Sequence, residues 1–160
     1  AARVKGRARR AGVRLATLVR TVIARILSIM ASAAPPAAPT AAAPAAPALS
    51  DSEFHRLSQA ALASIEAVID VWLQDDLIDI DAQRTGGLLE LAFPGGSKIV
   101  INTQPPLHEL WLASRAAGQH FRWVGGRWVD TRDGSEFFEV LSRQASAQGG
   151  VALRFDPPAT

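Results

Sequence analysis

Three glycine pairs in the middle of the chain, at 86–87, 95–96 and 125–126, most restrict how it can fold. Each pair stands between two short apolar segments, and Gly-Gly between such segments is typical of tight β-hairpin turns. A residue pair that turns the chain back on itself favours antiparallel pairing of consecutive strands. Pro105-Pro106 interrupts the pattern once more, because proline has no backbone N–H for a strand ladder. The predicted strands are 78–83, 88–93, 98–103, 107–114, 119–124 and 127–130.

Helical patterns flank this run of strands on both sides. Ser50 and Glu53 have the spacing of a capping box, which predicts a helix start. Apolar residues then recur at helical spacing on one stripe: Phe54, Leu57, Ala61, Ile65, Val68 and Trp72. Ser135 is expected to cap a second helix that ends near Ala147, and segment 151–155 is apolar enough to pack back onto the domain. The predicted fold is α+β: a two-layer αβ sandwich in which two helices cover one face of an antiparallel sheet.

The first 48 residues differ in composition from the rest. Residues 1–30 are basic, with apolar residues at helical spacing from Leu15 onward. This pattern is typical of a membrane-surface helix or a mitochondrial transit peptide, and a start at Met30, the only methionine, would remove it. Residues 31–48 contain 11 Ala and 5 Pro, which predicts a disordered linker. The expected organisation is a basic segment 1–30, a linker 31–48, a folded domain 49–155 and a tail 156–160.

The distribution of charge and the composition of the chain exclude several classes of function. Residues 51–160 hold nine basic and all fifteen acidic residues, a formal charge of −6, so no nucleic-acid partner is expected for the domain. Arg20 and Arg25 interrupt the N-terminal apolar run, which is too short to cross a membrane. The chain has no cysteine, which excludes thiol catalysis and cysteine-held clusters. Three scattered histidines and no nucleophile motif indicate a protein that is not an enzyme.

Acidic residues gather between positions 51 and 81, where eight stand against the single basic residue Arg56. Glu66 and Asp70 are one helical turn apart, and Asp79 and Asp81 are expected on the same side of the first strand. Carboxylate oxygens favour hard cations such as Fe²⁺ or Mn²⁺, and an open cluster without histidine or cysteine binds them weakly. The alternative is a solvated acidic face that protects a sheet edge from further pairing.

Trp111 interrupts the polar half of an alternating strand pattern. If Leu110 and Leu112 face the helices, Trp111 lies on the open face of the sheet. Asn102 and Gln104 alternate on the preceding strand and are expected beside it. An exposed tryptophan with neighbouring amides is typical of a protein-binding surface, and the alternative is a tryptophan partly covered by its neighbours. The other three tryptophans, Trp72, Trp123 and Trp128, are expected to be packing residues.

Several strings of residues resemble the bacterial frataxin homologues of the CyaY type. They are DSEFHRL at 51–57, GGSKIVIN at 95–102 and QPPLHELWLA at 104–113. Trp123, Trp128 and Asp133-Gly134 before the last helix complete the resemblance, which covers residues 50 to about 148.

The resemblance implies a five- to seven-stranded antiparallel sheet with two helices on one face. It implies weak iron binding at an acidic ridge and binding to a cysteine desulfurase and an iron–sulfur scaffold protein. The partner contacts correspond to Asn102, Gln104 and Trp111. The iron ligands correspond to Glu66, Asp70, Asp75, Asp76, Asp79 and Asp81.

The ridge of this chain is thinner than the family pattern. Ala67 and Val71 stand where relatives often carry acids, and Ala82 and Gln83 replace a more polar or acidic end of the first strand. The loop around 73–77 is about two residues longer. Stoichiometric iron loading is therefore not expected, whereas the surface for partners is better preserved.

The expected function is an iron-binding regulator or iron donor in iron–sulfur cluster assembly. The alternatives are an iron store or ferroxidase, and a protein-binding module that needs no metal. The expected protein is mainly monomeric, forms oligomers only with iron, and acts in the cytoplasm. A transit peptide at 1–29 would place it in the mitochondrial matrix instead.

Overall fold

A capping box begins the first helix of the computed structural model, which describes residues 49–159. The predicted segments 1–30 and 31–48 lie outside these residues. Helix α2 spans Asp51–Gln74. The Ser50 hydroxyl accepts a hydrogen bond from the Glu53 amide at 3.3 Å, and the Glu53 carboxylate accepts one from the Ser50 amide at 3.2 Å. The Ser50 hydroxyl also donates to the Glu53 carboxylate at 2.6 Å, and this bond, followed by the one from the Ser50 amide, favours the ionised carboxylate and lowers the pKa of Glu53. The predicted start of the helix is confirmed.

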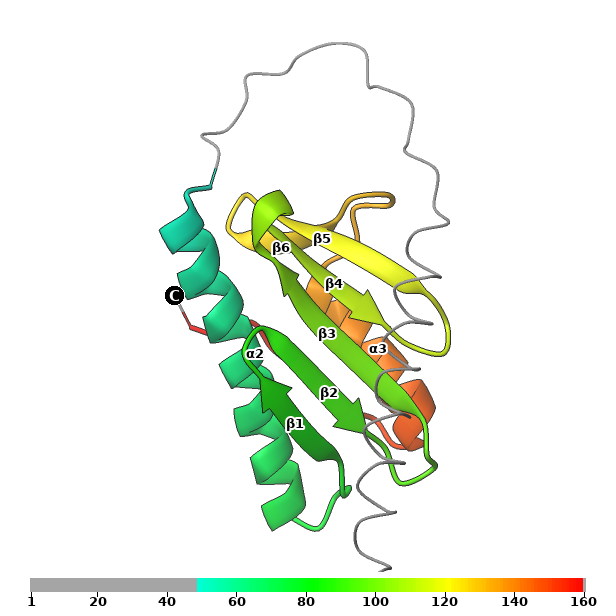
Figure 1. Cartoon of the computed structure of the whole chain (residues 1–160). Helices are drawn as coiled ribbons and strands as arrows, with labels where there is room; N and C mark the ends of the chain where they lie inside the picture. The colour runs from blue at the N-terminus through cyan, green and yellow to red at the C-terminus, as the bar shows by residue number, and fades with distance from the viewer. Residues whose placement is uncertain (1–48, 160) are drawn as a thin grey trace, which may run out of the picture. The chain divides into compact units, whose positions relative to one another are not determined.

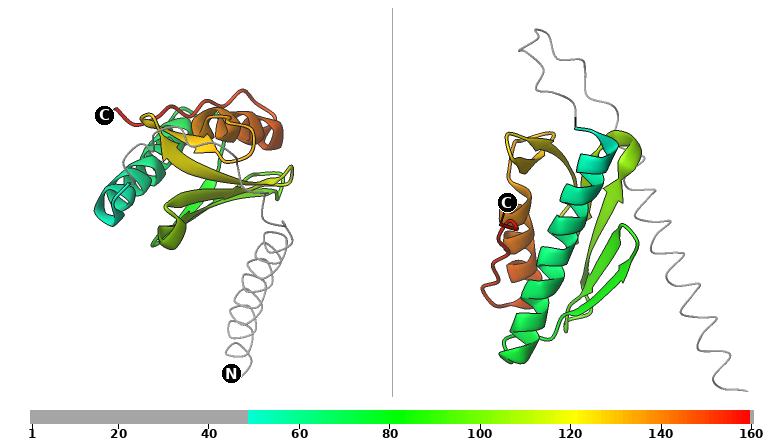
Figure 2. Two further views of the ribbon diagram at one scale, coloured as in Figure 1. Left: turned by 90° about the horizontal axis from the view of Figure 1, so that it is seen from above. Right: turned by 90° about the vertical axis from the view of Figure 1, so that its left-hand side faces the viewer.

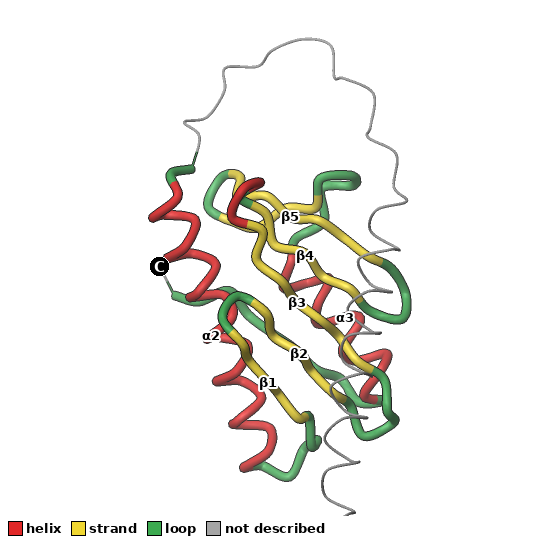
Figure 3. The backbone as a smooth tube through the Cα atoms, viewed as in Figure 1, coloured by secondary structure: helices red, strands yellow, loops and turns green. Residues whose placement is uncertain are grey.

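The six strands form one antiparallel sheet in chain order, as the glycine pairs predict (Figures 1 and 3). The strands are β1 (Asp81–Thr85), β2 (Leu88–Ala92), β3 (Lys98–Gln104), β4 (Glu109–Ala113), β5 (Gly118–Val124) and β6 (Arg127–Asp130). Each strand therefore pairs with the strands that precede and follow it in the sequence, and β1 and β6 form the two edges of the sheet.

Two strands begin later than predicted, and the other strand boundaries lie within two residues of the prediction. The first strand begins at Asp81 rather than at 78, so Asp79 lies just before the strand; Asp79 and Asp81 are both exposed, with the buried Ile80 between them. Apolar and polar residues also alternate in the extended segment 78–80, so the sequence pattern is longer than the hydrogen-bonded strand. The fourth strand begins at Glu109 rather than at 107, because Pro105–Leu107 forms a short 3₁₀ helix, η1. His108 then adopts a left-handed conformation with φ of 51°, which ends η1 and redirects the chain.

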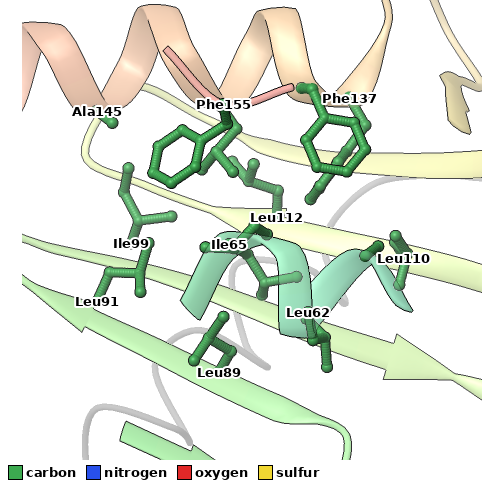
Figure 4. Close-up of a cluster of buried hydrophobic side chains, with 14 of the residues drawn as sticks. Leu62, Ile65, Leu89, Leu91, Ile99, Leu110, Leu112, Phe137, Ala145 and Phe155 are labelled. Carbon is green, nitrogen blue, oxygen red and sulfur yellow. The ribbon is translucent and has the colours of Figure 1, made fainter. Parts of the chain in front are cut away.

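Among residues 49–159, helices α2 and α3 lie on one face of the sheet and no element covers the other, which we call the open face (Figure 2). Between the two layers, apolar side chains from helices and strands form the core that Figure 4 shows in close-up. Phe138 and Leu141 of α3 are buried, as predicted. Trp128 is buried in the core, while Trp72 and Trp123 pack against it, so their predicted packing role is confirmed.

Helix α3 spans Phe137–Gly149, and its cap is Glu136 rather than Ser135. The Glu136 carboxylate accepts a hydrogen bond from the Glu139 amide at 3.0 Å. Ser135 instead belongs to the preceding turn, where its amide donates to Asp133 at 2.9 Å. The helix also continues two residues beyond the predicted end, because Gly150 takes the left-handed conformation that ends a helix.

The segment after α3 packs back onto the domain, as its apolar character predicts. Leu153 and Phe155 are buried, and the Phe155 ring lies 4.8 Å edge-on from Trp72 of α2. Two α3 hydroxyls hold the backbone of this segment: Ser146 accepts from the Leu153 amide at 2.8 Å, and Ser142 from the Phe155 amide at 2.9 Å. Segment 151–155 therefore contacts both helices: Phe155 packs against α2, and the backbone of the segment is hydrogen-bonded to α3.

No helix within residues 49–159 has an apolar stretch long enough to span a lipid bilayer.

Candidate functional site: the open face and the acidic edge

The open face carries a transverse row of polar and aromatic side chains at its centre. The register of the sheet places Asn102 opposite Trp111, and Trp111 opposite His120. Gln104 lies two positions along β3 and pairs with Glu109. Leu110 and Leu112 are fully buried on the helical side, so Trp111 points to the open side, as alternation predicts. We call the surface of Asn102, Gln104 and Trp111 the tryptophan face.

A buried carboxylate holds Trp111 in place. Glu109 is only 4% exposed although it lies on the open face. Its carboxylate accepts a hydrogen bond from the Trp111 indole N–H at 2.9 Å and another from Nε of Arg122 at 2.8 Å. The two bonds use both oxygens of Glu109, so its charge is compensated and the indole is fixed at its polar end.

His120 fixes the flat side of the same indole. The two rings stack with centroids 4.3 Å apart and planes 8° from parallel. The His120 Nδ1 lies 3.7 Å from a Glu109 oxygen. Burial nevertheless lowers the pKa of His120, because desolvation of the imidazolium outweighs the attraction of Glu109. The lowered pKa favours the neutral imidazole, and the contact of His120 with the indole is ring stacking.

The six predicted iron ligands are spread over the C-terminal part of α2, the loop that follows it and the start of β1. Asp70 is exposed on the helix, Asp75 ends the helix, and Asp76 is exposed in the left-handed conformation with φ of 53°. Asp79 and Asp81 are exposed at the first edge of the sheet. We call these five residues the acidic edge.

The sixth predicted ligand, Glu66, is engaged in an ion pair. Its carboxylate accepts a hydrogen bond from Arg84 of β1 at 2.7 Å, and the same guanidinium bonds to Gln59. Within residues 49–159, no three histidine or carboxylate side chains converge closely enough to chelate a metal ion. The acidic edge therefore consists of separate, solvated carboxylates, and a cation at Glu66 would share that carboxylate with Arg84.

Three residues orient Trp111 and are not among the site residues predicted from the sequence: Glu109, His120 and Arg122. Alternation places Glu109 on the open face, but an acid there is expected in solvent. Its burial follows from the width of Trp111 beside it and from Arg122, which stands opposite Glu109 on β5. A carboxylate two residues before an outward tryptophan, with an arginine at the paired position, is the signal that sequence reasoning could have used.

Comparison with known proteins shows the family of the chain. Residues 47–151 match the model of the frataxin-like domain. A protein of Polaromonas sp. named iron-sulfur cluster assembly protein CyaY is 46% identical over 110 residues, which are 69% of this chain and 95% of the relative. A protein of the same name from Cupriavidus taiwanensis is 48% identical over 109 residues, 68% and 98% of the two chains. The solved frataxin of Psychromonas ingrahamii shares 34% identity with a TM-score of 0.56, covering 66% of this chain and 97% of that one. The chain belongs to the frataxin-like family.

Proposed function

We propose that this protein acts in iron–sulfur cluster assembly by binding a cysteine desulfurase and its scaffold protein through the tryptophan face. The names of its relatives, iron-sulfur cluster assembly protein CyaY, support the process. The orientation of Trp111 by Glu109 and His120 is the observation that carries the mode of action. The protein contributes contacts and charge rather than a catalytic step.

The fixed orientation of Trp111 favours binding, because its side chain loses little conformational entropy when a partner covers it. Trp111 is half-buried: His120 covers one side of the indole, and the hydrogen bond and the stacked ring hold the remaining surface in one orientation. Asn102 and Gln104 stand beside it with amide groups that donate and accept hydrogen bonds. An aromatic anchor surrounded by polar groups is the usual composition of an interface centre.

The acidic edge supplies the electrostatic part of the proposal. Asp79 and Asp81 are exposed at the edge strand of the same sheet, so a basic patch of the desulfurase can meet them while Trp111 is covered. The same carboxylates bind Fe²⁺ weakly, which makes the protein an iron-responsive regulator or an iron donor. Oligomers form only when iron bridges such edges.

Binding to the desulfurase tests the tryptophan face. Trp111→Ala should weaken binding by about 30-fold or more, the effect of removing a central aromatic anchor. Leu107→Ala, at a half-exposed leucine outside the tryptophan face, is the matched control and should leave the affinity unchanged. Equal affinities of the wild type and Trp111→Ala would refute this mode of docking.

Charge reversal tests the acidic edge. Asp79→Lys combined with Asp81→Lys should weaken binding at low salt, and the difference should shrink as salt rises. Glu139→Lys, at an exposed acid on the opposite layer, serves as the control. A loss of affinity that is independent of salt would contradict electrostatic docking.

Metal titration distinguishes the alternatives. Amide NMR signals of residues 70–81 should shift selectively with Fe²⁺ under nitrogen, and Asp75→Asn with Asp76→Asn should reduce the shifts while Asp156→Asn does not. No selective shift would favour a module that needs no metal. Oxygen uptake on Fe²⁺ addition above a protein-free control would favour an iron store or ferroxidase.

The place of action belongs to the same proposal. The named relatives are bacterial, which supports action in the cytoplasm. The alternative of a transit peptide at 1–29 lies outside the described residues. The mass of the mature N-terminus decides between them.

A further inference from the structure

We propose that the tryptophan face, together with Leu88 beside it, binds an uncharged partner segment in the polyproline II conformation, with apolar side chains three residues apart. The inference rests on the proposed function, which makes this face a docking surface, and adds the chemistry of the segment that docks. Its basis is a row of three side chains across β2, β3 and β4, which are adjacent strands of the sheet (Figure 1).

The row consists of an amide between two apolar groups. The sheet register places Leu88 opposite Asn102, and Asn102 opposite Trp111. All three residues are half-buried, and Leu89 is fully buried on the helical side, so Leu88 points to the open face. A partner segment that covers Trp111 and continues across the strands therefore meets Asn102 and then Leu88.

The charged groups on the open side of β2–β5 compensate one another. Lys98 donates a hydrogen bond to Glu90 at 2.5 Å, and Arg122 donates one to Glu109 at 2.8 Å. The lowered pKa of His120 favours its neutral form. A charged partner segment would lose hydration here without meeting an unpaired opposite charge. An uncharged segment is therefore the electrostatic complement of this part of the sheet.

The spacing of the two apolar groups selects the conformation of the segment. Leu88 and Trp111 are two strands apart, which is about 9.6 Å at ~4.8 Å per strand. A polyproline II helix has three residues per turn and a rise of about 3.1 Å, so side chains on one side recur every ~9.3 Å. Side chains on one side of a β-strand recur every ~6.8 Å, which does not match. An α-helix approaches the distance with seven residues, ~10.5 Å, but its backbone groups are bonded internally.

Asn102 offers a hydrogen bond to the backbone of such a segment. Its side-chain amide bonds to no other residue of 49–159, whereas the Trp111 N–H is already bonded to Glu109. A polyproline II backbone has no internal hydrogen bonds, so a carbonyl between the two apolar anchors can accept from Asn102. Proline suits the anchor positions, because its backbone is already restricted and its ring packs on aromatic side chains. The expected motif is Pro-x-x-Pro without charged residues.

Two peptides of equal composition test the inference by NMR titration of the full chain. They are acetyl-Ala-Pro-Ala-Ala-Pro-Ala-amide, with prolines three positions apart, and acetyl-Ala-Pro-Ala-Pro-Ala-Ala-amide, with prolines two positions apart. The first should shift the indole N–H of Trp111 and the backbone amides of Leu88 and Asn102. The second should bind more weakly by about fivefold or more.

Variants of the chain locate the peptide on the row. Leu88→Ala and Asn102→Leu should each weaken binding of the first peptide about threefold or more. Val151→Ala, at an exposed valine after α3, is the matched control and should bind like the wild type. Circular dichroism checks that each variant is folded. Equal binding by the wild type and both row variants would place the peptide elsewhere and overturn the site.

The other outcomes separate this inference from the proposed function. Equal binding of the two peptides would overturn the polyproline II conformation. Tighter binding at high salt when both terminal alanines become lysine, or glutamate, would overturn the uncharged segment. Shifts of the same signals with protein concentration alone would show a second copy on this face instead. If neither peptide binds while desulfurase binding still depends on Trp111, the inference falls and the proposed function stands; if desulfurase binding does not depend on Trp111, the proposed docking itself falls.

Discussion

Glu109 is the residue whose replacement best tests how the tryptophan face is organised. Glu109→Gln keeps the shape of the side chain but leaves one oxygen where the wild type has two. That oxygen can accept from Trp111 or from Arg122, but not from both, and the new amide N–H group faces the other donor. Arg122 is 62% exposed and can turn into water, whereas Trp111 is fixed beside His120. We therefore expect Arg122 to leave.

The expected cost is modest and can be worked from these contacts. A hydrogen bond to a charged group contributes about 1.5–3 kcal/mol when it is buried. The exposure of Arg122 reduces this contribution to about 1 kcal/mol, since water competes for the guanidinium. Glu109→Gln should thus lower the free energy of unfolding by about 1 kcal/mol. Glu109→Ala also removes the indole bond and should cost about 2 kcal/mol.

Urea denaturation followed by circular dichroism measures these free energies. A double-mutant cycle of Glu109→Gln with Arg122→Gln isolates the pair, and its coupling energy should be about 1 kcal/mol. The Trp111 emission should shift in Glu109→Ala and stay close to the wild type in Glu109→Gln, in a background where the other three tryptophans are phenylalanine. A coupling energy near zero would refute the reasoning, because Glu109 would then be buried without help from Arg122.

Three further predictions concern stability. Phe155→Ala should lower the free energy of unfolding by about 3 kcal/mol, because the ring is buried against Trp72, and thermal denaturation measures the loss. Asp76→Gly should raise it by about 0.5 kcal/mol in urea denaturation, since glycine adopts the left-handed conformation without steric cost; a decrease would contradict this. The pKa of His120 is lowered in the folded protein, so the unfolded chain binds more protons between that pKa and about 6.5, and stability should fall as pH falls through this window. His120→Asn should remove this part of the pH dependence in urea titrations at several pH values.

Local signals in the chain predicted the architecture but not every boundary. The glycine pairs and the capping box each specify a backbone geometry within a few residues, so the strand order and the start of α2 are as expected. Ser135 shows the limit of such signals. Serine and glutamate can both cap a helix, and only the hydrogen bond of Ser135 to Asp133 in the preceding turn leaves the role to Glu136.

The position of a site residue could be predicted only where the alternation along a single strand determines it. Alternation along β4 suffices to place Trp111 on the open face, because Leu110 and Leu112 must face the core. The burial of Glu109 depends on a neighbouring strand, and its partner Arg122 lies thirteen residues away in sequence. The ion pair of Glu66 with Arg84 likewise joins helix to strand, and charge counting along α2 contains no sign of it.

If the acidic edge binds iron and the tryptophan face docks the desulfurase, as proposed, the distance between the two surfaces determines how iron affects partner binding. Asp81 lies three strands and four residue positions from Trp111 in the sheet register, which is about 20 Å at ~4.8 Å per strand and ~3.4 Å per residue. One metal ion cannot touch both surfaces, but a standard interface of about 800 Å² per partner is wide enough to cover both.

Fe²⁺ on the acidic edge cancels negative charge that a basic partner needs, so iron should weaken docking of the desulfurase. By linkage, the desulfurase should weaken iron binding by the same factor. In Asp79→Asn with Asp81→Asn the effect of Fe²⁺ on the affinity should shrink. If iron strengthens docking instead, the metal bridges the two proteins rather than competing with the partner.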